Sequence, residues 1–195
     1  MNEKISNDLS ISDASSREGS LDVDSEPPEP GFRILVANEQ SSLAIENASL
    51  VNAVRTVLAE SNYFSGMISI AVVDDPRIHE LNRQYLQHDY PTDVLSFALV
   101  DEPPHLEGEL VVSSDTAMRN AAELGWMASD ELLLYAIHGA LHLVGHRDKS
   151  PADNAAMCRE ELAHLQKLGV SLPADRSRWT EAHLPTDYSG ENFAK

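Results

Sequence analysis

Two histidines in one apolar segment are the residues best suited to chemistry in this sequence. His138 and His142 lie four positions apart in the segment 131–145, which reads ELLLYAIHGALHLVG. This spacing places both imidazoles on one face of a helix, one turn apart, where they can reach a single metal ion. Burying two imidazoles among leucines without partners would cost several kcal/mol. We therefore predict that His138 and His142 bind a metal ion.

A third ligand is expected from the chain that follows this helix. Gly145 can adopt a positive φ without steric cost, so it suits the end of the helix and lets the chain turn back. His146 and Asp148 then compete for the third position. His146 follows the glycine at once, whereas Asp148 has two further residues in which to fold back. We favour Asp148 as the ligand and expect His146 to support the site or to contact the substrate.

Three protein ligands leave a fourth position for water, which is typical of catalytic zinc sites. Zinc lowers the pKa of its bound water to about 7, so hydroxide is available at neutral pH. The spacing H-x3-H-x5-[H/D] also occurs in metzincin proteases. However, Gly139 stands where H-E-x-x-H peptidases carry their general base. The motif therefore favours a zinc hydrolase that cleaves another bond, such as a phosphodiester, over a peptidase.

Composition and charge narrow the class of protein. The chain has 195 residues, an apolar fraction of 42% and a net charge of -18. That charge opposes general affinity for nucleic acid, so no DNA partner is expected, although a local basic cleft or the metal could still hold RNA. The lone Cys158 excludes an internal disulfide. No apolar run approaches the roughly 18 residues of a membrane span, and the polar N-terminus is unlike a signal peptide, so we expect a cytoplasmic protein.

The elements that would position the histidines can be read from the patterning. Residues 1–30 hold eight acidic and two basic side chains and are expected to be a disordered tail, 31–168 the folded domain, and 169–195 a second tail. Ser114 and Asp130 are expected to cap their helices. Strands are predicted at 32–36, 67–73, 94–100 and 109–113, and helices at 43–61, 77–86, 114–124, 131–145 and 151–168. This order predicts an α+β fold: a small mixed sheet of about four strands covered by helices, with the histidine helix facing a cleft.

Several motifs together resemble those of a known family. HGALHLVGHRD (138–148) resembles the signature of the YbeY family, the bacterial endoribonucleases and ribosomal-RNA maturation factors. ELNRQYLQHDYPTDVLSF (80–97), GELVVSSDTA (108–117) and MCREEL (157–162) resemble other motifs of the family in the right order. The resemblance covers about residues 32–168, so both tails lie outside it.

The resemblance implies an activity, a cofactor and partners. It implies one zinc ion per chain, bound by His138, His142 and Asp148, with His138 and His142 acting in catalysis through the metal-bound water. It implies hydrolysis of single-stranded RNA, maturation of the 3′ end of 16S ribosomal RNA, and ribosome quality control. The implied partners are ribosomal RNA precursors and the small ribosomal subunit, with no membrane.

Two positions depart from the family pattern. Asp148 stands where the family usually has histidine, although aspartate also occurs there. Leu86 stands where the family usually has an arginine that lines the cleft and holds phosphate. Arg83 or His88 could supply the missing cation, and with His146 they are our candidate substrate-binding residues. The alternatives are a zinc-binding, ribosome-associated factor that cleaves RNA weakly or not at all, and a zinc hydrolase of another class such as a peptidase.

Overall fold

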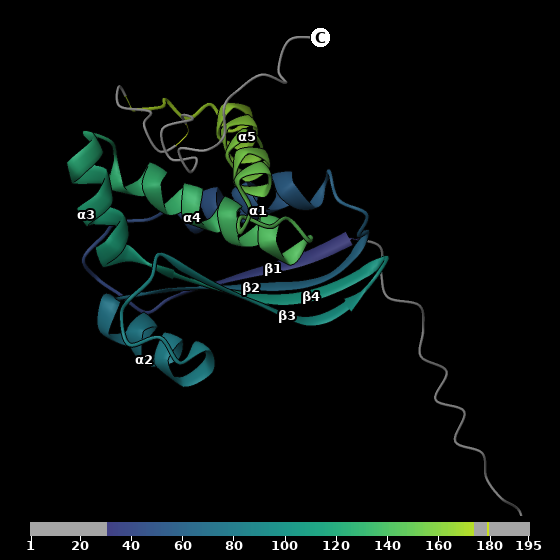
Figure 1. The fold of residues 1–195 in the computed structure, drawn as a ribbon, viewed down its shortest axis with the longest axis horizontal. Helices are drawn as coiled ribbons and strands as arrows, with labels where there is room; N and C mark the ends of the chain where they lie inside the picture. The colour runs from purple at the N-terminus through teal and green to yellow at the C-terminus, as the bar shows by residue number, and fades with distance from the viewer. Residues whose placement is uncertain (1–30, 174–178, 180–195) are drawn as a thin grey trace, which may run out of the picture.

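A four-stranded mixed sheet lies at the centre of the structure, a computed structural model that describes residues 31–173 and 179 (Figure 1). The strand order is β1-β2-β4-β3, with β1, β2 and β4 parallel and β3 antiparallel to β4. The strands are β1 (Gly31–Asn38), β2 (Ser65–Val73), β3 (Val94–Glu102) and β4 (His105–Ser113). The predicted tail 1–30 lies outside the described residues, as does most of the predicted tail 169–195.

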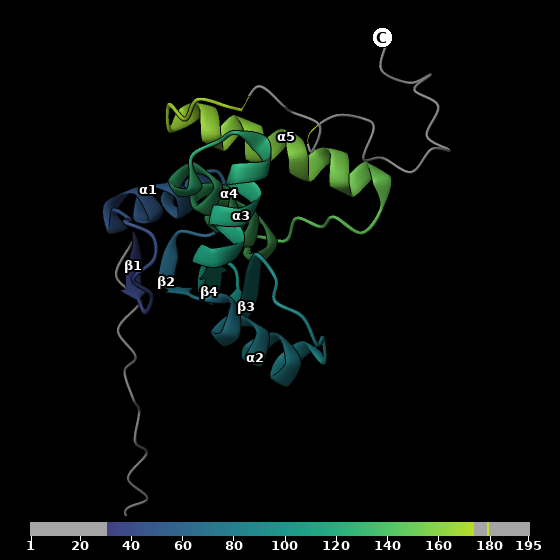
Figure 2. The ribbon, with the colours of Figure 1, turned by 90° about the vertical axis from the view of Figure 1, so that its left-hand side faces the viewer.

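Five helices cover this sheet unequally. Helices α1 and α4 lie on one face, α5 lies on their outer side, and α2 lies on the opposite face (Figures 1 and 2). The helices are α1 (Asn47–Leu58), α2 (Asp75–Leu86), α3 (Ser114–Leu124), α4 (Ala128–Leu143) and α5 (Pro151–Lys167). This arrangement confirms the predicted α+β class. Among the described residues, none of these helices is both long and apolar enough to cross a membrane.

The core follows from the alternation of side chains along the strands. Ile68, Ile70 and Val72 of β2 point to the face covered by α1 and α4, where each is at most 1% exposed. Val73 belongs to a smaller cluster with residues of α2, β3 and β4 on the other face. The larger cluster therefore holds α4 rigidly against the sheet.

A glycine lets α4 approach the sheet closely. A Cβ atom on Gly108 of β4 would lie 2.8 Å from Cδ1 of Leu143, so only glycine fits there without displacing that side chain. Strand β4 begins at His105, four residues earlier than predicted. Leu106 and Leu110 both point into the core, and Glu107 and Glu109 alternate with them, so the strand pattern extends back beyond residue 109. Gly108 interrupts this apolar alternation in the sequence.

Both predicted helix caps were wrong. The side chain of Ser113, not Ser114, caps α3: its Oγ accepts a hydrogen bond from the backbone N–H of Thr116 at 3.1 Å. Ser114 is already helical, and its hydroxyl donates to the carbonyl of Val73 at 3.0 Å. Helix α4 begins at Ala128 without a side-chain cap, so Asp130 lies within its first turn.

Candidate metal centre

Helix α4 holds the two predicted histidine ligands in place. Its buried residues pack into the main core, so the helix cannot rotate without exposing them. Gly139, between the two ligands in sequence, faces the sheet, and its carbonyl accepts a hydrogen bond from Ser96 Oγ at 3.1 Å. His138 and His142 are instead partly exposed, at 21% and 29% of their side-chain surface. The helix thus presents both rings at its solvent-accessible edge.

Three candidate ligand atoms converge beyond this edge. Nε2 of His138 lies 3.0 Å from Nε2 of His142. Oδ2 of Asp148 lies 4.0 Å from the first of these atoms and 3.7 Å from the second. Gly145 has φ of 98°, the left-handed conformation expected where the chain turns back after the helix. The turn therefore brings Asp148, the favoured third ligand, to the two histidines.

The other ring nitrogens show which form each imidazole takes. Nδ1 of His138 lies 2.7 Å from Oε1 of Glu161, and Nδ1 of His142 lies 3.0 Å from the backbone oxygen of His146. A carboxylate and a backbone carbonyl only accept hydrogen bonds, so both Nδ1 atoms must carry the proton. In the neutral rings, each Nε2 then presents a lone pair.

Two lone pairs and a carboxylate therefore face one point. Such acceptors repel one another unless a proton or a cation lies between them. A tetrahedral zinc ion with bonds of 2.0–2.1 Å sets its ligand atoms about 3.3 Å apart. The three observed separations, 3.0, 3.7 and 4.0 Å, are close to that value. His138, His142 and Asp148 thus fit a zinc ion and leave room for a fourth, non-protein ligand.

The electrostatics of His138 agree with a cation at this point. Burial by itself would lower the pKa of His138, because it disfavours the charged ring. The hydrogen bond and charge of Glu161, with the charges of Asp93 and Asp148, outweigh burial and raise that pKa. The surroundings of the ring therefore favour positive charge.

The structure describes all three candidate substrate-binding residues, His146, Arg83 and His88. His146 turns its backbone carbonyl to His142, and the residue also lines a hollow together with Glu60, which follows α1, and His164 of α5. Arg83 is exposed on the last turn of α2, and His88 stacks on Tyr90 with ring centroids 5.4 Å apart. Among the described residues, no hydrogen bond or ion pair joins the side chains of these three candidates to the metal-ligand atoms. Their roles remain predictions.

Leu86 occupies the last position of α2 and is 47% exposed. The neighbouring Tyr85 packs edge-to-face on Phe97, with ring centroids 5.4 Å apart. Loop 87–93 then leads to β3 and ends at Asp93, whose Oδ1 accepts hydrogen bonds from Thr92 Oγ1 and from the N–H of Val94. Asp93 thus caps the turn before β3, and its charge also raises the pKa of His138.

Glu161 is a site residue that the sequence reading missed. It lies on the buried face of α5, one turn from both Met157 and Leu165, and is 8% exposed. An acidic residue at helical spacing among buried apolar residues was the signal that could have revealed it. By accepting the Nδ1–H of His138, it fixes the tautomer and orientation of that ligand, as carboxylates commonly do beside zinc-binding histidines.

A second group of possible ligands, Glu60, Glu160 and His164, already has a lysine beside it. Carboxylate oxygens of Glu60 and Glu160 lie within 4.8 Å of a ring nitrogen of His164. However, Nζ of Lys167 lies 2.5 Å from Oε1 of Glu60 and supplies a positive charge there. Burial and Lys167 lower the pKa of His164, unlike that of His138. The group around His138 is therefore the better metal site.

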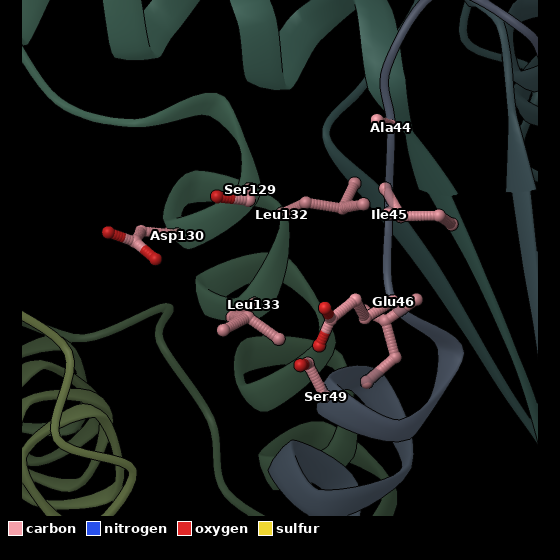
Figure 3. Close-up of a pocket in the computed structure, with 9 residues that line it drawn as sticks. Ala44, Ile45, Glu46, Ser49, Ser129, Asp130, Leu132 and Leu133 are labelled. Atoms are coloured by element: carbon pink, nitrogen blue, oxygen red, sulfur yellow. The ribbon is translucent and has the colours of Figure 1, made fainter.

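A separate hollow of about 390 Å³ lies at the other end of α4 (Figure 3). It is lined by Ala44, Ile45, Glu46, Ser49, Leu50, Ser129, Asp130, Leu132 and Leu133. Asp130 is eight residues before His138, or about 12 Å along the helix axis. Burial raises the pKa of Asp130. This hollow contains none of the three candidate ligands, so it is distinct from the metal centre.

Comparison with known proteins identifies the family. The family model described as Endoribonuclease YbeY matches residues 35–169, which include all three candidate ligands and Glu161. The chain belongs to the YbeY family. A YbeY relative from Rhodopirellula baltica is 52% identical over 110 residues, which span 55% of this chain and 57% of that protein. A relative from Pelotomaculum thermopropionicum is 36% identical over 149 residues, spanning 71% and 98% of the two chains.

One further YbeY relative and one solved structure are similar to this chain. One from Desulfitobacterium hafniense is 38% identical over 140 residues, spanning 64% of this chain and 89% of its own. A solution structure of a Thermotoga maritima protein covers 74% of this chain and 99% of its own, with 26% identity and a TM-score of 0.48. These curated relatives carry the name Endoribonuclease YbeY. The resemblance inferred from the sequence motifs is therefore confirmed at the level of the family.

Proposed function

We propose that this chain is a zinc-dependent endoribonuclease that cleaves single-stranded RNA. Its substrate would be precursor ribosomal RNA, at the 3′ end of the small-subunit species, and its partner the small ribosomal subunit. Family membership supports the nuclease activity, because the relatives are named endoribonucleases. Roles in ribosome quality control and a cytoplasmic location belong to the same proposal.

The convergence of His138 Nε2, His142 Nε2 and Asp148 Oδ2 carries the proposal for a metal. When bound, zinc supplies Lewis-acid chemistry, making a nucleophile available from water near neutral pH and offsetting phosphate charge. His138 and His142 hold the ion through lone pairs that Glu161 and the carbonyl of His146 direct toward it. Asp148 adds the negative charge that increases affinity for a dication.

The structure also supports choosing phosphodiester hydrolysis over peptide hydrolysis. A Cβ atom on Gly139 would meet Val94 Cγ2 at 2.8 Å and Ser96 Oγ at 2.9 Å. A glutamate at this position would therefore point into the sheet and not at the metal. The general base of H-E-x-x-H peptidases has no equivalent at this place in the helix.

One observation favours a second candidate function, a zinc-containing ribosome-associated factor that cleaves RNA poorly. Leu86 offers no positive charge to a phosphate, and the chain carries a net charge of -18. Among the described residues, neither Arg83 nor His88 makes a hydrogen bond or ion pair with the metal ligands that would mark it as a substitute. Both functions need the same metal centre, so only a rate measurement separates them.

The experiment is cleavage of a labelled single-stranded RNA by the purified full chain. We expect cleavage that chelation abolishes and added zinc restores, while His138→Ala stays inactive after zinc is added. A duplex of the same sequence should resist cleavage. Stoichiometric zinc with no cleavage would support the second candidate, and protein free of zinc would overturn both.

A further inference from the structure

Trp179 contacts the metal centre from outside the part of the chain that matches the family. The match ends at residue 169, whereas the indole Nε1 of Trp179 donates a hydrogen bond to Oε2 of Glu161 at 3.0 Å. The other carboxylate oxygen, Oε1, accepts from Nδ1 of His138 at 2.7 Å. One carboxylate therefore joins the indole to a candidate metal ligand.

The two hydrogen bonds together determine how this carboxylate is oriented. The terminal torsion of a glutamate side chain has a broad energy profile, so one hydrogen bond does not fix the plane of the carboxylate. A second donor on the other oxygen restricts that rotation. Glu161 is 8% exposed, so water has little access to replace a missing donor. The indole N–H thus holds Oε1 where the imidazole of His138 needs it.

The indole is itself held by a second tryptophan. Trp126 and Trp179 pack edge-to-face, with ring centroids 5.9 Å apart and an angle of 88° between their planes. Nε1 of Trp126 donates to the backbone oxygen of Ser171 at 2.7 Å. Both rings pack against the main core. The position of the Trp179 N–H is therefore determined by packing as well as by its bond to Glu161.

We propose that Trp179 is a positioning residue for the metal centre: its N–H orients the Glu161 carboxylate, which in turn orients His138 for metal binding. This inference rests on the proposed zinc site. It assigns a role in that site to a residue beyond the region shared with the family. Trp179 acts only through Glu161, so its effect should be seen first in metal affinity.

The test compares two matched substitutions in the full chain. Trp179→Phe keeps an aromatic ring but removes the N–H that Glu161 accepts. Trp126→Phe removes the N–H that Ser171 accepts and leaves Glu161 untouched. Zinc affinity, measured by competition with a chromophoric chelator, should fall roughly three- to tenfold for Trp179→Phe, less than the tenfold or more expected for a direct partner of a ligand. It should change far less for Trp126→Phe, which keeps an aromatic ring packed against Trp179.

A double-mutant cycle separates positioning from general loosening of the structure. Glu161→Gln replaces the carboxylate by an amide with one oxygen and one NH2 group, so it accepts from only one of His138 and Trp179. In this background, Trp179→Phe removes a competing donor and should leave zinc affinity unchanged or raise it. A merely structural role would lower affinity in both backgrounds.

The possible outcomes lead to distinct conclusions. A parent chain that binds zinc, with no change on Trp179→Phe, would overturn this inference and leave the proposed function standing. Equal losses for Trp179→Phe and Trp126→Phe, or an equal loss in the Glu161→Gln background, would also overturn it. A parent chain that binds no zinc would overturn the inference and the proposed metal centre together.

Discussion

Nε2 of His138 and Nε2 of His142 lie 3.0 Å apart, although the hydrogen bonds at their Nδ1 atoms leave a lone pair on each. In the neutral rings these lone pairs repel. The arrangement becomes favourable when a cation accepts both, and Asp148 is placed to be a third ligand. Measuring the metal content of the protein is therefore the most direct test of this proposed metal site.

The first prediction concerns that metal content. The full chain, purified without chelators, should contain about one zinc ion per molecule. His138→Ala and His142→Ala should each lose it, because two remaining ligands do not hold zinc tightly. Metal analysis by plasma mass spectrometry checks this. His164→Ala is the matched control, because it removes a histidine from the group of Glu60, Glu160 and His164. This variant should keep its zinc.

The second prediction ranks Asp148 against His146. Asp148→Ala removes a ligand atom and should weaken zinc binding by about 100-fold or more. His146→Ala keeps the backbone carbonyl that accepts from His142, so it should change affinity less than threefold, well below the 10- to 100-fold typical of losing a partner of a ligand. Chelator competition on both variants provides the comparison. The reverse ranking would mean that the ring of His146 turns to the metal.

The third prediction concerns pH. The pKa of His138 is raised, so in the metal-free protein its ring holds the second proton to a higher pH than usual. Zinc must displace that proton from Nε2. Zinc affinity should therefore be constant at pH values above this pKa. It should fall as the pH drops through the pKa, by about tenfold per pH unit for one displaced proton.

Glu161→Gln provides the control for the pH profile. It removes the negative charge of Glu161, which helps to raise the pKa of His138, and leaves only a neutral amide oxygen as a hydrogen-bond acceptor. The fall in zinc affinity should then begin at a lower pH than in the parent chain. An identical pH profile for both proteins would contradict this account of the His138 pKa.

The fourth prediction concerns Leu86. A cation beside the scissile phosphate stabilises negative charge in the transition state, and such contacts are worth roughly a hundredfold or more in rate. The native chain should therefore cleave single-stranded RNA slowly, and Leu86→Arg should raise the rate without changing zinc content. Initial rates on one RNA substrate test this.

The controls for Leu86 are Arg83→Ala and His88→Ala. If either residue already supplies the cation, its removal should abolish cleavage and Leu86→Arg should have little effect. If none of the three variants changes the rate, then cleavage does not depend on a cation at this end of α2.

The fifth prediction concerns the packing of α4. Gly139→Ala would place a methyl group 2.9 Å from Leu110 Cδ2 and 2.8 Å from Val94 Cγ2. Overpacking costs about 1–3 kcal/mol, and the higher helix propensity of alanine offsets up to about 1 kcal/mol. The free energy of unfolding of the metal-free protein should fall by about 1–2 kcal/mol in urea titrations. A more stable variant would show that α4 can move away from the sheet.

The sequence was sufficient wherever the relevant geometry is local. The spacing of His138 and His142 places them on one helix face because an α-helix repeats every 3.6 residues. Gly145 then marks the turn because positive φ suits glycine, and its φ is 98°. The positions of most helices and strands also followed from apolar periodicity. These features depend on residues within a few positions of one another.

Caps and strand ends were less predictable because they depend on where an extended segment stops. Ser113 and Ser114 are both suitable caps by residue type, and the length of β4 decided between them. That length depends on pairing along β2 over the whole of β4, including Gly108, which packs under Leu143. Propensity at a single position does not contain this information.

Only the tertiary structure decided what surrounds the metal ligands. Glu161 is 23 residues from His138, and it reaches the ring because α5 packs across α4. Trp179, 18 residues after Glu161, donates a hydrogen bond to the same carboxylate. His146 was expected to support the site or to contact the substrate; its carbonyl accepts from His142, a contact made by the turn after Gly145. Ligand spacing is a property of one helix, whereas the partners of the ligands depend on how separate helices pack together.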